Sequence, residues 1–236
     1  MKVEIWSDVM CPFCYIGKRR FENALTQFPQ KQEIEVIWKS FQLNPDMKTE
    51  PGKSINQYLS ETKGWSLEQA RQANEYVTNM AKEVGLSYDM NKAVVANSFD
   101  AHRLIQFAKA NDKGDAMEEQ LFKAYFTEGK NTADHNTLIQ LAAEIGLDKD
   151  AAEKVLKSNE YEDAVEQDIY ESQQIGVRGV PFFVLNDRYA VSGAQATETF
   201  LGALNKAWGE WEKERPVLKD ISSNDAAVCT PDGICD

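Results

Sequence analysis

The chain has 236 residues, of which 42% are hydrophobic and 27% charged, with a formal net charge of −12. A chain of this size and composition can bury a substantial core, so we expect one large globular domain or two closely packed ones. Lysine and arginine number 26 against 38 aspartates and glutamates, which leaves no basic field for phosphates and excludes nucleic acid as an expected partner.

The N-terminal residues lack the apolar run and small-residue cleavage site of a secretory leader, and no apolar run reaches membrane-spanning length. We therefore expect a cytoplasmic protein with no membrane partner. In a reducing cytosol, four cysteines indicate redox chemistry or metal binding rather than a structural disulfide framework.

The first fifty residues predict a strand, a helix and a second strand. Residues 3–8 alternate and are rich in β-formers, which predicts the first strand. From Cys14 to Phe28, apolar side chains recur at three- and four-residue steps, which predicts an amphipathic helix that ends at Pro29. Residues 33–41 alternate strongly and predict the second strand.

Helical periodicity replaces alternation from about residue 53 to residue 175. Three segments within this block end on a glycine that an apolar residue follows, which is the signature of a Schellman cap. These glycines are Gly85, Gly146 and Gly176.

Strand signal returns in the last quarter of the chain. Residues 180–185 and 188–191 flank an Asn-Asp turn and predict a hairpin. Residues 197–211 predict a final amphipathic helix, and the polar residues after Pro216 predict a tail.

Cys11 and Cys14 enclose Pro12 and Phe13 at the junction of the first strand and the first helix. Thiol exchange needs a thiolate that attacks and a second thiol that resolves the mixed disulfide, at an exposed site. The N-terminus of a helix favours a thiolate, and Pro12 fits the first turn. We therefore predict Cys11 as the nucleophile and Cys14, one turn on and more enclosed, as the resolving thiol. The alternatives are structural cysteines or half of a zinc site.

Pro181 stands at the start of a predicted strand, where proline is normally excluded. A trans proline on an edge strand or in a turn is the ordinary explanation. In the company of the thiol pair, a cis Val180–Pro181 bond is favoured, because it turns backbone polar groups toward the thiols for pairing with a substrate strand.

Three motifs, SDVMCPFCYIG at residues 7–17, NSFDAHRL at 97–104 and GVRGVPFF at 176–183, resemble landmarks of the DsbA-like branch of the thioredoxin superfamily. The resemblance covers about residues 1–211 and is strongest to the FrnE-like subgroup of cytosolic members. It implies an α/β, thioredoxin-like fold with a large all-helical insertion between the βαβ half and the cis-Pro ββα half. It also implies dithiol-disulfide oxidoreductase activity without a cofactor.

The expected domain limits follow from these segments. Residues 1–50 and 176–215 form a discontinuous thioredoxin-like domain, residues 51–175 form the helical insertion domain, and residues 216–236 form a C-terminal tail.

Two departures from relatives refine the expected chemistry. DsbA itself has a histidine between its cysteines that stabilises the thiolate, whereas Phe13 cannot donate to sulfur, so we predict a less oxidising pair. Related glutathione-dependent isomerases have serine in place of the first cysteine. Because Cys11 is a cysteine here, that activity is disfavoured.

Other side chains are candidates for shaping the site. Asp8 is either a turn residue or a proton relay near Cys14. His102 is expected to be a packed, hydrogen-bonded helix histidine, with a position in the wall of the thiol cleft as the alternative. The cations that follow the thiol pair are expected on a solvated helix face; they are Lys18, Arg19 and Arg20.

The tail contains Cys229 and Cys235 on either side of a Pro-Asp-Gly turn, which can bring the two thiols within disulfide reach. We predict a second redox pair. FrnE-like relatives have such a pair with four intervening residues, whereas this chain has five. The alternatives are incidental thiols and a four-cysteine zinc site with Cys11 and Cys14, although we expect no metal.

The leading hypothesis is a cytosolic dithiol-disulfide oxidoreductase or isomerase whose partners are protein or peptide thiols and disulfides, and glutathione. Two alternatives stay open. One is a DsbA-like adaptor that binds proteins without redox turnover, and the other is a glutathione-dependent isomerase.

Overall fold

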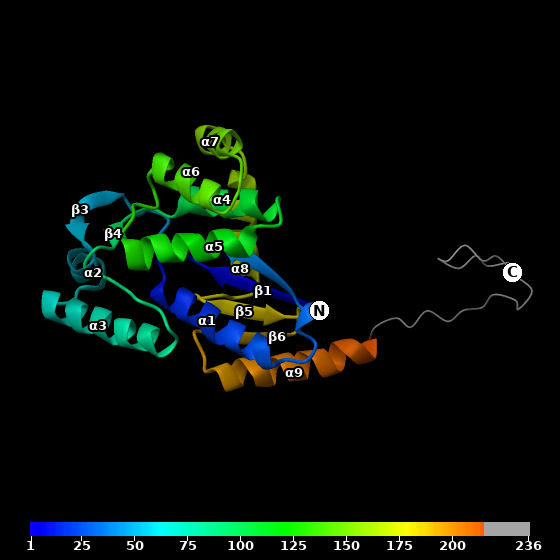
Figure 1. Ribbon diagram of the computed structural model, residues 1–236. Helices are drawn as coiled ribbons and strands as arrows, with labels where there is room; N and C mark the ends of the chain where they lie inside the picture. Colours follow the sequence, from blue (N-terminus) through cyan, green and yellow to red (C-terminus); the bar gives the residue numbers. More distant parts are fainter. Residues whose placement is uncertain (215–236) are drawn as a thin grey trace, which may run out of the picture.

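A mixed four-stranded sheet lies at the centre of the protein; the structure, a computed structural model, describes residues 1–214 (Figure 1). The two strands nearest the N-terminus run parallel, which requires a crossover helix between them, and the other two form an antiparallel hairpin. This sheet contains the strands that the sequence predicts. In spatial order they are β2 (Glu35–Ser40), β1 (Lys2–Ser7), β5 (Phe182–Leu185) and β6 (Tyr189–Ser192).

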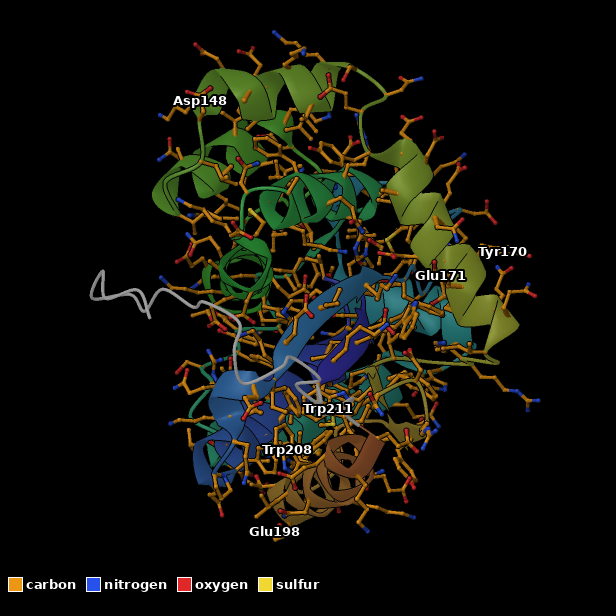
Figure 2. The ribbon with its side chains drawn as sticks, turned by 90° about the vertical axis from the view of Figure 1, so that its right-hand side faces the viewer. Asp148, Tyr170, Glu171, Glu198, Trp208 and Trp211 are labelled. Carbon is orange, nitrogen blue, oxygen red and sulfur yellow. The ribbon has the colours of Figure 1, made fainter. Side chains whose placement is uncertain are left out.

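Helices α1 (Pro12–Gln27) and α9 (Thr197–Glu214) lie together against one face of this sheet (Figure 1). Phe183 of β5 packs between them, with its ring centroid 5.4 Å from that of Phe21 and 4.6 Å from that of Phe200. Trp208 of α9, labelled in Figure 2, packs edge-on against Phe28 just after α1. Aromatic contacts therefore fix α1, and with it the thiol pair, on the sheet.

Between β2 and β5 in the sequence, the chain forms a predominantly helical insertion, as the sequence predicts. Most of these helices stack beside the sheet, while α2 and α3 form an arm next to the start of α1 (Figure 1). The helices are α2 (Ile55–Lys63), α3 (Leu67–Glu83), α4 (Phe99–Lys109), α5 (Gly114–Lys123), α6 (His135–Glu144), α7 (Lys149–Lys157) and α8 (Glu162–Gln174).

Two features of the insertion were not expected from the sequence, and the first of them is not helical. A short antiparallel ribbon pairs β3 (Glu50–Ser54) with β4 (Val94–Val95). The sequence concealed it because β3 contains proline and glycine and β4 is two residues long. The second feature is a π-helical turn, Ala124–Glu128, that continues α5.

The helix ends confirm the predicted Schellman caps. Gly85, Gly146 and Gly176 all have positive φ, between 76° and 79°. The backbone N–H of the following apolar residue reaches back to the carbonyl five residues earlier, as in the 2.9 Å bond from Leu86 to Ala81. Each cap is set by a few adjacent residues, which is why the sequence alone reveals it.

Asp168 of α8 links the helical insertion to strand β2 of the sheet. Its buried carboxylate accepts from the backbone N–H of Ser40 at 2.9 Å, from Gln106 Nε2 at 2.6 Å and from Lys39 Nζ at 2.9 Å. Glu171, on the same helix and labelled in Figure 2, also binds Lys39 Nζ. Helix α8 is therefore joined to β2 and α4 by a buried charge that has several partners.

No helix among residues 1–214 is long and apolar enough to cross a membrane. The predicted tail, with Cys229 and Cys235, lies outside the described residues, and the predicted domain limits stay a prediction.

Candidate active site

The first pair of cysteines lies where β1 passes into α1. Cys11 is the N-cap of α1, and its backbone N–H donates to the Asp8 carbonyl at 2.9 Å. Pro12 occupies the first helical position, where its missing N–H removes no intrahelical bond. The first turn contains no acidic residue to oppose the positive end of the helix dipole, so a negative charge is favoured at Cys11.

Both thiols are free and both are enclosed by the fold. Cys14 is 1% exposed, as its predicted role as the inner thiol requires, but Cys11 is only 3% exposed. The expectation of an exposed nucleophile is therefore wrong for the sulfur itself. The reason is that Cys11 packs against Val180. The exposed side chain between the two cysteines is Phe13, which is 39% exposed.

The environment of the Cys14 thiol favours its protonated form. Burial raises its pKa well above the usual value, and the neighbouring Cys11 sulfur raises it further. The Asp8 backbone N–H and the Ser7 hydroxyl lie beside the Cys14 sulfur and act in the opposite direction. A resolving thiol in this setting needs a base before it can attack.

The Val180–Pro181 segment faces Cys11 across the site. The Cys11 thiol donates to the Val180 carbonyl at 3.4 Å, and the Val180–Pro181 peptide bond, expected to be cis, is cis in the structure. Gly17 of α1 makes room for this proline, since a Cβ at position 17 would lie 2.9 Å from Pro181 Cγ. Residues 169 positions apart in the chain, Cys11 and Val180, thus meet at the thiol pair.

Asp8 orders the loop that leads into the thiol pair. Its side chain is 1% exposed and accepts from the Leu43 N–H at 2.7 Å and from the Met10 N–H at 3.3 Å. It is the backbone N–H of Asp8 that lies beside Cys14. This arrangement supports the turn interpretation of the side chain.

His102 packs against Asp8 from α4, with its Nε2 atom 3.4 Å from Asp8 Oδ1. The ring is 1% exposed, but neither nitrogen has a hydrogen-bond partner among residues 1–214. The expected hydrogen-bonded helix histidine is therefore wrong in that respect. The nearest carboxylate, that of Asp8, is oriented toward the backbone amides of Met10 and Leu43 rather than toward the ring.

The cations after the thiol pair do not form the expected solvated face. The Lys18 side chain is 2% exposed and pairs with acidic groups of α1 and α5, including Asp115 at 3.2 Å. Arg19 pairs with Glu119 of α5, and Arg20 donates to the Ala194 carbonyl at 2.7 Å. The acidic side chains of α5 therefore pair with Lys18 and Arg19, whereas Arg20 lies against the segment that contains Ala194.

Three contributors to the site were missed by the sequence reasoning. The Tyr88 hydroxyl donates to the Pro12 carbonyl at 2.7 Å, and its ring stacks on Phe126 with centroids 4.7 Å apart. Ser7 and Glu118 are also buried, and Ser7 lies near both the Cys14 sulfur and the Glu118 carboxyl group. The sequence did indicate that Glu118 is buried, because Glu118 shares a helix face with the apolar residues Leu121 and Phe122.

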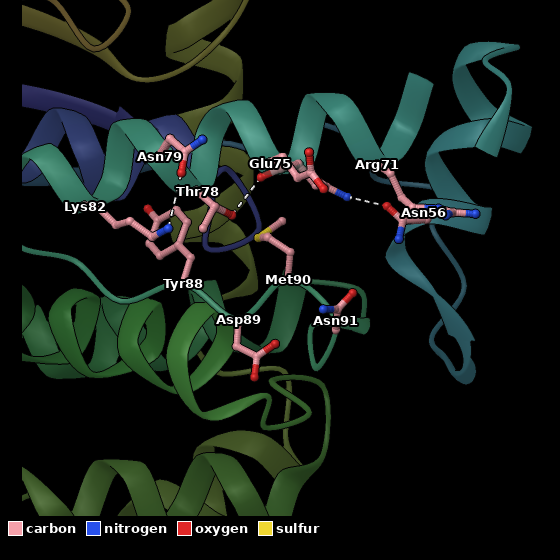
Figure 3. A pocket seen from close by; sticks show the side chains of 11 residues that line it. Asn56, Arg71, Glu75, Thr78, Asn79, Lys82, Tyr88, Asp89, Met90 and Asn91 are labelled. Atoms are coloured by element: carbon pink, nitrogen blue, oxygen red, sulfur yellow. Dashed lines mark hydrogen bonds between the residues drawn. The ribbon is translucent and has the colours of Figure 1, made fainter. Parts of the chain in front are cut away.

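One cavity borders Pro12, between the two cysteines, and a second lies beyond Tyr88. One, of about 330 Å³, begins beside Pro12 and has mainly apolar walls that include Met10, Leu43 and Met90. The other, of about 470 Å³, lies between α3 and the segment 88–91 and is polar, as Figure 3 shows. Tyr88 connects the polar cavity to the site, because it lines that cavity and also binds Pro12.

No group of three or more histidine, cysteine or acidic side chains that could hold a metal ion occurs within residues 1–214. The zinc alternative requires Cys229 and Cys235, which lie outside that range.

The fold and this site define a thioredoxin-like dithiol protein of the DsbA type. The model of the DSBA-like thioredoxin domain matches residues 2–205, and the chain belongs to this family. A probable DsbA oxidoreductase from Streptomyces coelicolor is 39% identical, with 100% of this chain and 98% of that one covered and a TM-score of 0.85.

The chain is similar to two further proteins. The uncharacterized protein YwbO of Bacillus subtilis (strain 168) is 28% identical over 211 residues, which cover 86% of this chain and 95% of that one. The cytosolic disulfide reductase DsbM of Pseudomonas aeruginosa, determined with GSH, shares the fold at 17% identity, with a TM-score of 0.61 and coverage of 91% and 98%. The predicted class, a DsbA-family thiol-disulfide oxidoreductase with a helical insertion, is confirmed.

Proposed function

We propose that the protein is a cytosolic, FrnE-like dithiol-disulfide oxidoreductase that exchanges disulfides with protein or peptide thiols through Cys11 and Cys14. The observation that carries the proposal is the contact of the Cys11 sulfur with the Val180 carbonyl, with Cys14 enclosed behind it. The helix N-terminus supports a thiolate at Cys11, and the Val180 segment offers a client strand backbone groups with which to pair.

The exchange proceeds through one mixed disulfide. The Cys11 thiolate attacks one sulfur of a client disulfide, and the other client sulfur leaves as a thiolate. Cys14 then loses its proton and attacks the Cys11 sulfur, and the Cys11–client bond breaks with its electron pair on the client. The client is reduced by two electrons and the protein dithiol is oxidised to a disulfide. Each step is reversible, so the same site serves oxidation.

The cavities support peptide-like partners. The apolar cavity beside Pro12 suits an apolar side chain near the client cysteine. The polar cavity carries charges of both signs, among them Arg71 and Glu75, which suits a small peptide thiol such as glutathione. The P. aeruginosa relative, a cytosolic disulfide reductase determined with GSH, supports both the cytosolic setting and glutathione as a partner.

The test is insulin reduction and refolding of a scrambled client by the wild type and by Cys11→Ser. We expect Cys11→Ser to abolish both activities, whereas replacement of both Cys229 and Cys235 by serine leaves catalysis by the first pair. Activity that survives in Cys11→Ser contradicts the proposal. Client binding without turnover, unchanged when Cys11 and Cys14 are both serine, would favour the adaptor. Glutathione-dependent isomerisation that survives in Cys11→Ser would favour the isomerase.

A further inference from the structure

The helical insertion reaches the thiol pair through Tyr88, which lies in the segment between α3 and β4 and is labelled in Figure 3. Its hydroxyl donates to the Pro12 carbonyl at 2.7 Å, and Pro12 is the first residue of α1, between the two cysteines. Tyr88 is 8% exposed, so this bond is largely shielded from water. In such surroundings a hydrogen bond is electrostatically stronger than it is in water.

The π-helical turn Ala124–Glu128 fixes the position of Tyr88. The ring of Tyr88 stacks on that of Phe126 in this turn, with centroids 4.7 Å apart and an angle of 22° between the ring planes. The backbone N–H of Asp89 donates to the Phe126 carbonyl at 2.7 Å, near a helix end, where carbonyls lack an intrahelical partner. The tyrosine is thus held through its ring and through the backbone of the next residue. Isolated π-helical turns often occur at functional sites.

The Pro12 carbonyl belongs to the same peptide unit as the Phe13 N–H, which lies in the first turn of α1. The N–H groups of a first turn have no intrahelical acceptor and form the positive end of the helix dipole. A donor on the carbonyl oxygen polarises the peptide unit and increases the partial positive charge on its N–H. Since a carbonyl has two lone pairs, it can accept from Tyr88 as well as from within the helix. The bond therefore strengthens the field that favours a negative charge at Cys11, the N-cap.

We propose that Tyr88 is a positioning residue of the thiol pair, which acts through the Pro12–Phe13 peptide unit to favour the Cys11 thiolate. The inference rests on the proposed function and deepens it, because it makes the redox equilibrium of the pair depend on the helical insertion. The thiolate belongs to the reduced form of the pair. Stabilisation of that form by the Tyr88 hydroxyl makes the pair more oxidising.

The Tyr88 hydroxyl keeps its proton and so remains a donor. Burial raises its pKa far above the usual value, and the neighbouring Cys11, Tyr15 and Cys14 raise it further. Arg19 acts in the opposite direction. The hydroxyl is thus a fixed dipole at neutral pH rather than a titrating group.

The test is the equilibrium of the pair with reduced and oxidised glutathione in Tyr88→Phe, in the full chain with Cys229→Ser and Cys235→Ser. This substitution removes the hydroxyl and keeps the stacked ring. We expect the equilibrium to shift by about threefold toward the protein disulfide, which is the size of a typical charge effect at a helix terminus. A residue that only packs would change the stability of both redox forms alike and leave this equilibrium unchanged.

Alkylation of Cys11 by iodoacetamide, measured with Cys14→Ser added to that background, isolates the nucleophile. At neutral pH Tyr88→Phe should slow this alkylation by about threefold, because less thiolate is present. At alkaline pH, where the thiol is fully ionised, the proteins with and without Tyr88→Phe should react at equal rates. A slower reaction at both pH values would show reduced access to the sulfur instead and would overturn the proposal.

The matched control is Tyr125→Phe, the same substitution in the same aromatic cluster. The Tyr125 ring packs edge-on against Phe126 with centroids 4.8 Å apart, and its hydroxyl has no hydrogen-bond partner among residues 1–214. Loss of this hydroxyl should leave the glutathione equilibrium unchanged.

A fluorotyrosine incorporated at position 88 makes the opposite change. Its hydroxyl is more acidic and a stronger donor, so the equilibrium should shift toward the dithiol. This protein keeps the test valid if Tyr88→Phe does not fold.

A Tyr88→Phe protein with the wild-type equilibrium, or an equal shift in Tyr125→Phe, overturns the role of Tyr88. A wild type whose Cys11 and Cys14 form no disulfide in glutathione buffers would instead overturn the proposed function, so the two failures are distinguishable.

Discussion

Replacing Gly17 by alanine tests whether the thiol-bearing helix must approach Pro181 as closely as the structure indicates. A Cβ at this position would lie 2.9 Å from Pro181 Cγ, 3.5 Å from Phe183 Cζ and 3.6 Å from the Ala194 Cα atom. Carbon atoms prefer separations of about 3.5–4.0 Å, so the rigid proline ring must move by roughly 0.6 Å or more. Such overpacking costs about 1–3 kcal/mol.

The gain in helix propensity opposes this cost and has to be separated from it. Alanine in place of glycine inside a helix stabilises by about 0.5–1 kcal/mol. Gly202 of α9 provides the matched control, because a Cβ there meets nothing within 4 Å. Gly202→Ala should therefore show the propensity gain alone, and the difference between the two variants gives the steric cost.

Urea denaturation of the reduced proteins provides the measurement. We expect Gly17→Ala to be less stable than Gly202→Ala by about 1–3 kcal/mol. Its insulin reduction should also be slower than that of the wild type, because the displaced proline carries Val180 away from Cys11. Two variants of equal stability, within about 0.5 kcal/mol, would refute the close approach of α1 to Pro181.

Three further predictions concern the potential, the fold and pH. Phe13→His should make the pair more oxidising in a glutathione redox titration, since a histidine there can stabilise the Cys11 thiolate; an unchanged or more reducing potential would contradict this. Asp168→Ala should destabilise by about 3–5 kcal/mol in urea, because the buried Ser40 N–H and Gln106 Nε2 lose a charged acceptor, whereas the exposed Asp163→Ala should be neutral; equal effects would contradict the role of Asp168 as a buried acceptor. Burial raises the pKa of Glu118 to about 7, so its contribution to stability is complete below the unfolded value near 4.5 and is lost as pH rises through 7. The stability of the wild type relative to Glu118→Gln should thus fall by about 3 kcal/mol between pH 4 and pH 8, and a constant difference would exclude the raised pKa.

The features that the sequence predicts well are those that adjacent residues determine. The thiol pair at a strand–helix junction depends on positions 11–14, and each Schellman cap depends on one glycine and its neighbours. The hairpin and the final helix follow from local alternation and periodicity. The overall architecture could therefore be predicted once these segments were combined with the family resemblance.

The features that escaped prediction depend on residues far apart in the chain. Glu118 lies near Ser7 only because α5 packs against the sheet, and the helical periodicity around position 118 predicts its burial but not this neighbour. Gly17 looks like an ordinary helix glycine until Pro181 is placed against it. The burial of Lys18 likewise depends on the acidic side of α5, so the sequence near Lys18 wrongly indicated a solvated face.

The most direct test of the central claim is to trap the mixed disulfide. The Cys14→Ser protein, in the Cys229→Ser, Cys235→Ser background, is incubated with a disulfide-containing client peptide and analysed by peptide mapping and mass spectrometry. The account predicts that the client accumulates in a disulfide with Cys11, and that the matched Cys11→Ser protein traps none through Cys14. A client bound to Cys14 in Cys11→Ser, or no adduct at Cys11 in Cys14→Ser, would contradict it.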